Sequence, residues 1–136
     1  MILLDSSVLS RVFRRRRPGP QERRLQATFG ALMSSDAPLG LPGIVLQEVQ
    51  SGLRSERQFG ELRAKLLGAF TIVPASVADH LEAARLKNLC ASKGANLSGI
   101  DCLIAASAIR GGHELFAADT DFEAIRRHSG LKLLAW

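Results

Sequence analysis

The stretch MILLDSSVLS, residues 1–10, decides how the chain begins. The apolar residues 2–4 predict a short buried β-strand that ends directly at Asp5. Apolar residues then recur at the spacing of one helix face, which predicts a helix over residues 6–13. Asp5 therefore has two interpretations. It is the N-cap of that helix, since aspartate is a favoured cap, or it holds a ligand at the end of a buried strand.

The remaining chain alternates between strand and helix patterns. Strands are expected at residues 37–41, 71–73, 114–118 and 132–134, and helices at residues 22–34, 42–53, 55–70, 76–92, 98–110 and 120–128. Pro38 favours an edge or loop position for the second strand. Such alternation predicts an α/β fold with a mainly parallel sheet, and 136 residues suit a single domain spanning residues 1–136.

Composition favours a soluble protein of the cytoplasm. No apolar run approaches the ~20 residues of a membrane span, and a charge as early as Asp5 disfavours a signal peptide. Cys90 and Cys102 lie in apolar, helical patterns and are expected to be reduced core thiols. The three histidines form no zinc-binding pattern, and no glycine-rich phosphate loop follows a strand.

The positive charge is concentrated in one segment. Residues 11–24 hold seven arginines and one acid, while the whole chain has a net charge of +5, so the rest is close to neutral. A local cluster of this kind attracts polyanions, above all nucleic acid, although an acidic protein partner or a merely solvated loop fits it too. The candidate contact residues are Arg14, Arg15, Arg16 and Arg17.

Carboxylates follow two of the expected strands. Asp5 and Asp119 each come directly after an apolar run, and Asp121 follows two residues later. If both strands are parallel and central, these acids lie at the carboxyl edge of the sheet, where open α/β sheets bind ligands. Glu48 and Asp101 also stand among apolar residues of predicted helices, where a carboxylate needs a partner or a metal.

Most of these acids also have a structural explanation. Asp101 lies three residues after Ser98 and fits a capping box, and residues 120–123 (TDFE) fit another, so Glu123 needs no chemistry. Glu48 has no such local explanation. Gathered on one edge, the acids would repel one another, and a hard divalent cation such as Mg²⁺ or Mn²⁺ would neutralise them. An acidic metal site beside an arginine cluster points to phosphodiester hydrolysis.

Four blocks in this order resemble the PIN-domain ribonucleases, in particular the VapC-type toxins of toxin–antitoxin pairs. The blocks are MILLDSSVL, QEVQSGL, LSGIDCLIAASAIRGG and LFAADTDFEAI. The resemblance covers nearly the whole chain. It implies a three-layer α/β/α domain with about five strands and a Mg²⁺- or Mn²⁺-dependent endoribonuclease. It also implies a homodimer neutralised by a cognate VapB-type antitoxin whose tail enters the acidic groove.

By position, the resemblance makes Asp5, Glu48, Asp101 and Asp119 the acidic quartet. Asp5, Asp101 and Asp119 are expected to hold the metal directly or through water, and Glu48 to orient or deprotonate the attacking water. Ser6 and Asp121 are expected to support the site. One departure is Ala117, which stands where many family members carry a threonine.

Two other functions fit parts of the pattern. One is a non-catalytic PIN-like module that binds RNA or antitoxin, against which the full acidic set argues. The other is a haloacid-type hydrolase with a nucleophilic aspartate, which would need a second aspartate two residues after Asp5 and a lysine after a later strand. Ser7 occupies the first of these positions.

Overall fold

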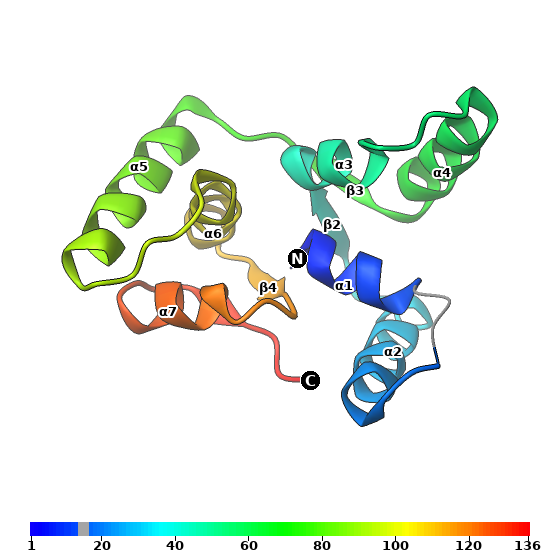
Figure 1. Cartoon of the computed structure of the whole chain (residues 1–136), viewed down its shortest axis with the longest axis horizontal. Coiled ribbons are helices and arrows are strands. Elements are labelled where there is room, and N and C mark those ends of the chain that lie inside the picture. The colour runs from blue at the N-terminus through cyan, green and yellow to red at the C-terminus, as the bar shows by residue number, and fades with distance from the viewer. Residues whose placement is uncertain (14–16) are drawn as a thin grey trace.

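The computed structural model describes residues 1–13 and 17–136, and within them the chain alternates between helices and strands as expected (Figure 1). The elements are β1 (Ile2–Leu4), α1 (Ser6–Val12), α2 (Pro20–Met33), β2 (Leu39–Pro42), α3 (Gly43–Gln50), α4 (Glu56–Ala69), β3 (Thr71–Val73), α5 (Val77–Ser92), α6 (Gly99–Gly111), β4 (Glu114–Phe116), α7 (Asp121–Arg127) and β5 (Lys132–Leu133).

The strands form one parallel sheet in the order β3-β2-β1-β4-β5. From β1 to β3 the chain moves in one direction along the sheet, and from β4 to β5 it moves in the other. Because crossovers between parallel strands are right-handed, the helices of the two halves must cover opposite faces. Figure 1 shows this separation, with α1–α4 on one side and α5–α7 on the other. The predicted three-layer α/β/α class is confirmed.

The centre of the sheet is also the centre of the core. Leu3 and Leu4 of β1, and Leu115 and Phe116 of β4, have no exposed surface, because helices cover both faces of these strands. The two strands are neighbours, and the chain leaves them in opposite directions. Their carboxyl ends therefore form the switch point at which open α/β sheets bind ligands.

Two details of the sequence prediction change. Of the two positions expected from Pro38, the edge of the sheet is wrong, because β2 lies between β1 and β3, and the loop is correct, because β2 begins at Leu39. Pro38 stands just before it, where no ladder donor is needed, and its carbonyl accepts a hydrogen bond from the Ile2 N–H at 2.9 Å. Helix α2 begins at Pro20, two residues earlier than expected, since proline suits the first helical turn.

Cys90 and Cys102 are buried and free, as expected. Among the described residues, no helix has both the length and the apolar character that crossing a bilayer requires.

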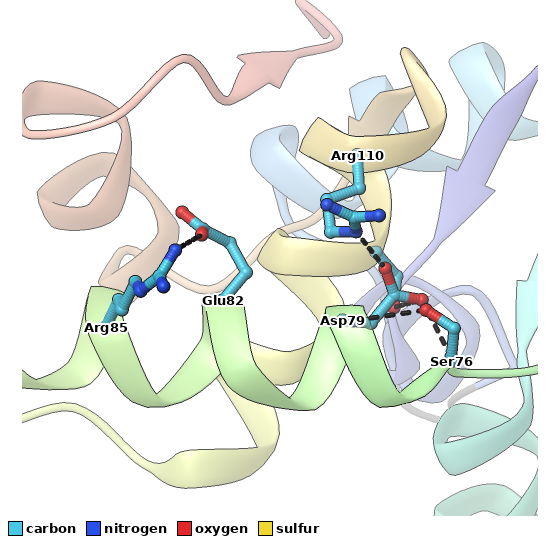
Figure 2. Close-up of polar contacts among 6 residues, drawn as sticks. Ser76, Asp79, Glu82, Arg85 and Arg110 are labelled. Atoms are coloured by element: carbon cyan, nitrogen blue, oxygen red, sulfur yellow. Dashed lines mark hydrogen bonds and ion pairs between the residues drawn. The ribbon is translucent and has the colours of Figure 1, made fainter.

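The pair α5 and α6 is joined by a polar contact at one end (Figure 2). Asp79 closes a full capping box with Ser76, and its other oxygen accepts a hydrogen bond from Arg110 Nε at 3.1 Å. The Asp79 side chain is only 12% exposed, whereas the Glu82–Arg85 pair on the same helix is far more solvated. The first contact therefore contributes more to stability than the second.

We expect Asp79→Ala to lower the free energy of unfolding by about 2 kcal/mol, because it removes a cap and leaves Arg110 without its partner. The matched control is Glu82→Ala on the same helix, which should change stability by no more than about 0.5 kcal/mol. Urea unfolding followed by circular dichroism measures both. Equal effects of the two substitutions would contradict the assigned role of Asp79.

Candidate metal centre

Four of the predicted acids line one cleft of about 560 Å³: Asp5, Glu48, Asp101 and Asp119. They come from four different places in the sequence, namely the end of β1, helix α3, the first turn of α6 and the loop after β4. The structure thus brings together side chains that are up to 114 residues apart in the chain. Their common position is the carboxyl edge of the two central strands.

Asp5 both caps a helix and faces the cleft. Its side chain is buried, and Oδ2 accepts hydrogen bonds from the backbone N–H of Ser7, at 3.1 Å, and from the Ser7 hydroxyl. The cap interpretation of Asp5 is therefore confirmed. It does not exclude a bound ligand, because both bonds go to Oδ2 and neither occupies Oδ1. Burial raises the pKa of the Asp5 carboxyl, the Ser7 bonds oppose that rise, and the charge of Asp119 adds to it.

Ser7 is a site residue that the sequence did not single out. Its hydroxyl donates to Asp5 and accepts the Ala118 N–H at 3.0 Å. One side chain therefore links the two strand ends that carry Asp5 and Asp119. Ser6, which was expected to support the site, also lines the cleft. Burial raises the pKa of Glu48 overall, and the Ser6 hydroxyl partly opposes that rise.

Asp101, Asp119 and Asp121 form the tightest group of carboxylates. One oxygen from each lies within 4.8 Å of the others. Asp119 Oδ1 accepts the Asp121 N–H at 2.9 Å, a bond that fixes the loop after β4. Asp121, expected only in a supporting role, is thus close enough to share a ligand with the other two.

Mutual repulsion is clearest at Asp101. Its backbone N–H donates to Ser98 Oγ at 3.1 Å, so the predicted cap is present, but the Ser98 N–H does not donate to the Asp101 carboxylate in return. Burial, together with the charges of Asp5 and Asp119, raises the pKa of Asp101 from 3.8 to about 6. The folded chain therefore holds this carboxylate at an energetic cost.

Glu48 carries the most direct sign of a missing partner. Its Oε1 is fully buried, and no described group donates a hydrogen bond to it. Burial and the charge of Asp5 raise the pKa of Glu48. A buried carboxylate oxygen normally requires a donor, a proton or a cation.

These observations fit a hard divalent cation. The donor atoms are all carboxylate oxygens, which Mg²⁺ and Mn²⁺ prefer. None of the ion pairs within residues 1–13 and 17–136 involves the five acids of the site. The group therefore has no positive counter-charge in the described part of the chain, although its members repel one another.

The structure bears on the expected cap at residues 120–123 and on part of the arginine cluster. The capping box predicted at residues 120–123 is wrong: Thr120 makes no side-chain cap bond, and Glu123 instead pairs with Arg126. Within the arginine cluster, Arg17 is exposed. Arg14, Arg15 and Arg16 lie outside the described residues.

Known proteins share this fold. FitAcB from Neisseria gonorrhoeae is 23% identical, with 99% of this chain and 97% of that chain covered and a TM-score of 0.76. VapBC-1 from nontypeable Haemophilus influenzae is 17% identical, with 100% and 98% covered and a TM-score of 0.78. VapC20 from Mycobacterium tuberculosis, a toxin that cleaves the sarcin-ricin loop, is 15% identical, with 91% and 94% covered and a TM-score of 0.69.

The family model named PIN domain matches residues 2–128, which include β1 and α7 and every acid of the site. The fold, the switch point between β1 and β4, and this match agree, and the chain belongs to the PIN domain family.

Proposed function

We propose that this protein is a metal-dependent endoribonuclease toxin that hydrolyses RNA phosphodiester bonds and is neutralised by a VapB-type antitoxin. The observation that carries the proposal is the set of four carboxylates from four segments of the chain in one cleft, with no ion pair to any of them among the described residues. PIN domain membership supports a nuclease. The similar fold of VapC20, a toxin that cleaves the sarcin-ricin loop, supports RNA as the substrate.

In this proposal Asp5, Asp101 and Asp119 hold Mg²⁺ or Mn²⁺. Asp121 is a further candidate ligand, because one of its carboxylate oxygens lies within 4.8 Å of oxygens of Asp101 and Asp119. When bound, such an ion stabilises negative charge on a phosphate and makes a bound water more acidic. The ligands must be ionised to bind it. The hydrogen bonds from Ser7 favour the ionised form of Asp5 and oppose the rise in its pKa that burial causes.

Glu48 is the group best suited to accept a proton from the attacking water. It lies in the same cleft as the proposed ligands, and its buried Oε1 has no other partner among the described residues. Its raised pKa brings the carboxylate closer to the range in which a general base is effective at neutral pH.

The cleft also suits a peptide inhibitor. Beside the acids it has an apolar wall, and Phe13 in that wall is 63% exposed. A peptide with a cationic side chain for the acids and apolar side chains for the wall would fill both parts. This chemistry supports an antitoxin tail as the occupant. The expected homodimer stays a prediction, which light scattering coupled to gel filtration would check.

Cleavage itself is tested by incubating the purified protein with total RNA in the presence of Mn²⁺ or EDTA. We expect discrete fragments with Mn²⁺ and none with EDTA, because the carboxylates alone repel the phosphate. Identical band patterns under both conditions, together with retained RNA binding, would favour the non-catalytic binding module. Sequencing of the fragment ends would then identify the RNA and the cleavage site.

We expect Asp5→Asn to abolish RNA cleavage while leaving the melting temperature equal to or above that of the wild type. Asparagine is also a good N-cap, so α1 keeps its first turn. The substitution also removes one charge from a repelling group. A gel assay and thermal unfolding measure the two effects. Loss of several kcal/mol of stability with activity retained would show that Asp5 serves only as a cap.

The pH dependence of metal-free stability follows from Asp101. Its pKa is about 6 in the folded chain, above the ordinary 3.8, so the folded state binds the proton more tightly. This contribution to stability is present below about pH 4 and is lost as the pH rises through 6. We expect the unfolding free energy in EDTA to fall over that window, and less steeply in Asp101→Asn.

Urea titrations at a series of pH values measure this slope. Added Mn²⁺ should restore stability above pH 6, because the ion binds the ionised, folded site. Equal slopes in the wild type and Asp101→Asn would mean that Asp101 is not the strained group.

Replacing Arg14, Arg15, Arg16 and Arg17 by glutamine should weaken RNA binding for all sequences alike. Each lost phosphate contact should reduce the slope of log affinity against log salt by roughly 0.7 for single strands. Fluorescence anisotropy in the inactive Asp5→Asn background measures this. The control is Arg85→Gln with Lys93→Gln, near α5 on the opposite side of the molecule from α1 and α2 (Figure 1). Unchanged slopes in the first variant would exclude the cluster as a substrate contact.

A further inference from the structure

The position of Asp119 is not set by the sheet alone. Pairing between β4 and β1 ends where Phe116 O accepts the Asp5 N–H at 3.0 Å. On the other side of β4, the backbone bond from Leu134 N reaches Leu115 O at 2.8 Å. Beyond these bonds the chain leaves the sheet and reaches Asp119 three residues after Phe116. Something else must orient this short connection.

Two side chains hold a single peptide unit in that connection, the one between Ala117 and Ala118. Its N–H donates to Ser7 Oγ at 3.0 Å, and its C=O accepts the indole N–H of Trp136 at 3.0 Å. The N–H and C=O of a trans peptide point in opposite directions, so the two bonds fix the plane from both sides. The orientation of this plane determines the direction in which the chain continues to Asp119.

The indole takes the place of a ladder bond. In a parallel pair, bonds to one strand recur every two residues, so the acceptor after Leu115 O is Ala117 O. Here the Trp136 side chain supplies the donor for that acceptor. The face of the indole ring contacts a cation: Cζ of Arg24, in α2, lies over the ring at 6.0 Å from its centroid.

We propose that Trp136 is a positioning residue of the metal centre, which sets the placement of Asp119 by clamping the Ala117–Ala118 peptide against Ser7. Trp136 is not among the residues that line the cleft, and its indole N–H donates to a backbone oxygen rather than to a carboxylate, so its effect passes through the backbone. The proposal rests on the proposed function only in taking Asp119 as a ligand. Its test is therefore metal binding rather than RNA cleavage.

The test compares Trp136→Phe with Arg24→Gln by calorimetric titration of Mn²⁺ into the whole protein. Phenylalanine keeps an aromatic ring and loses the N–H, whereas Arg24→Gln keeps the N–H and loses the cation on the ring. We expect Trp136→Phe to weaken Mn²⁺ binding roughly tenfold, as the loss of groups that orient metal ligands does. Arg24→Gln should bind Mn²⁺ like the wild type.

A second measurement needs no substitution. Trp136 is the only tryptophan, so the indole N–H gives one signal in a ¹H–¹⁵N spectrum. We expect slow exchange with solvent, and a shift on Mg²⁺ addition that follows the same titration curve as the backbone signal of Asp119. An indole that exchanges as fast as free tryptophan and ignores Mg²⁺ would overturn the proposal.

The remaining outcomes separate the two proposals. If Trp136→Phe melts at a lower temperature but binds Mn²⁺ as tightly as the wild type, the indole is structural and the positioning role is refuted. If the wild type leaves RNA intact while Trp136→Phe alone loses Mn²⁺ affinity, the positioning role holds and the nuclease function fails.

Discussion

Electrostatic repulsion among carboxylates gathered at one edge of the sheet is the constraint on which the site depends. Burial and neighbouring negative charges raise the pKa values of Asp5, Glu48 and Asp101, and each shift measures a cost to the folded state. Burial of apolar side chains in the core offsets this unfavourable energy. The residues that end β1 and β4 before Asp5 and Asp119, namely Leu3, Leu4, Leu115 and Phe116, have no exposed surface, so packing holds the two strand ends together against the repulsion.

Topology explains why the acids meet at this edge. The chain leaves β1 towards one side of the sheet and β4 towards the other, so no crossover covers the gap between their carboxyl ends. Helix α3 approaches from one layer with Glu48, and α6 from the other with Asp101. The cleft is thus a consequence of the strand order, and its chemistry comes from the acids that follow β1 and β4 and from those that α3 and α6 carry.

Much of this could be predicted from the sequence, because buried strands and amphipathic helices have periodicities of their own. The five strands and the acids that follow β1 and β4 were found in this way. The role of Ser7 in linking the two strand ends could not be found, since its second partner, the Ala118 N–H, comes close only through the pairing of β1 with β4. The sequence left the position of β2 open for a related reason: Pro38 fell within the expected strand, and only the structure shows that the strand begins after it and lies inside the sheet.

The motif Ser-x-x-Asp shows that the same local sequence can serve two different purposes. It occurs at residues 76–79 and 98–101, and in both places the serine oxygen accepts the aspartate N–H. Asp79 then completes the capping box and pairs with Arg110, whereas Asp101 makes no return bond and stands near Asp119 and Asp121. Identical local motifs thus give a neutralised structural contact in one helix and a strained carboxylate in the next. The difference lies in the charge of the groups that face each aspartate: the Arg110 guanidinium pairs with Asp79, whereas Asp101 faces other carboxylates and would be neutralised by a proton or a bound cation.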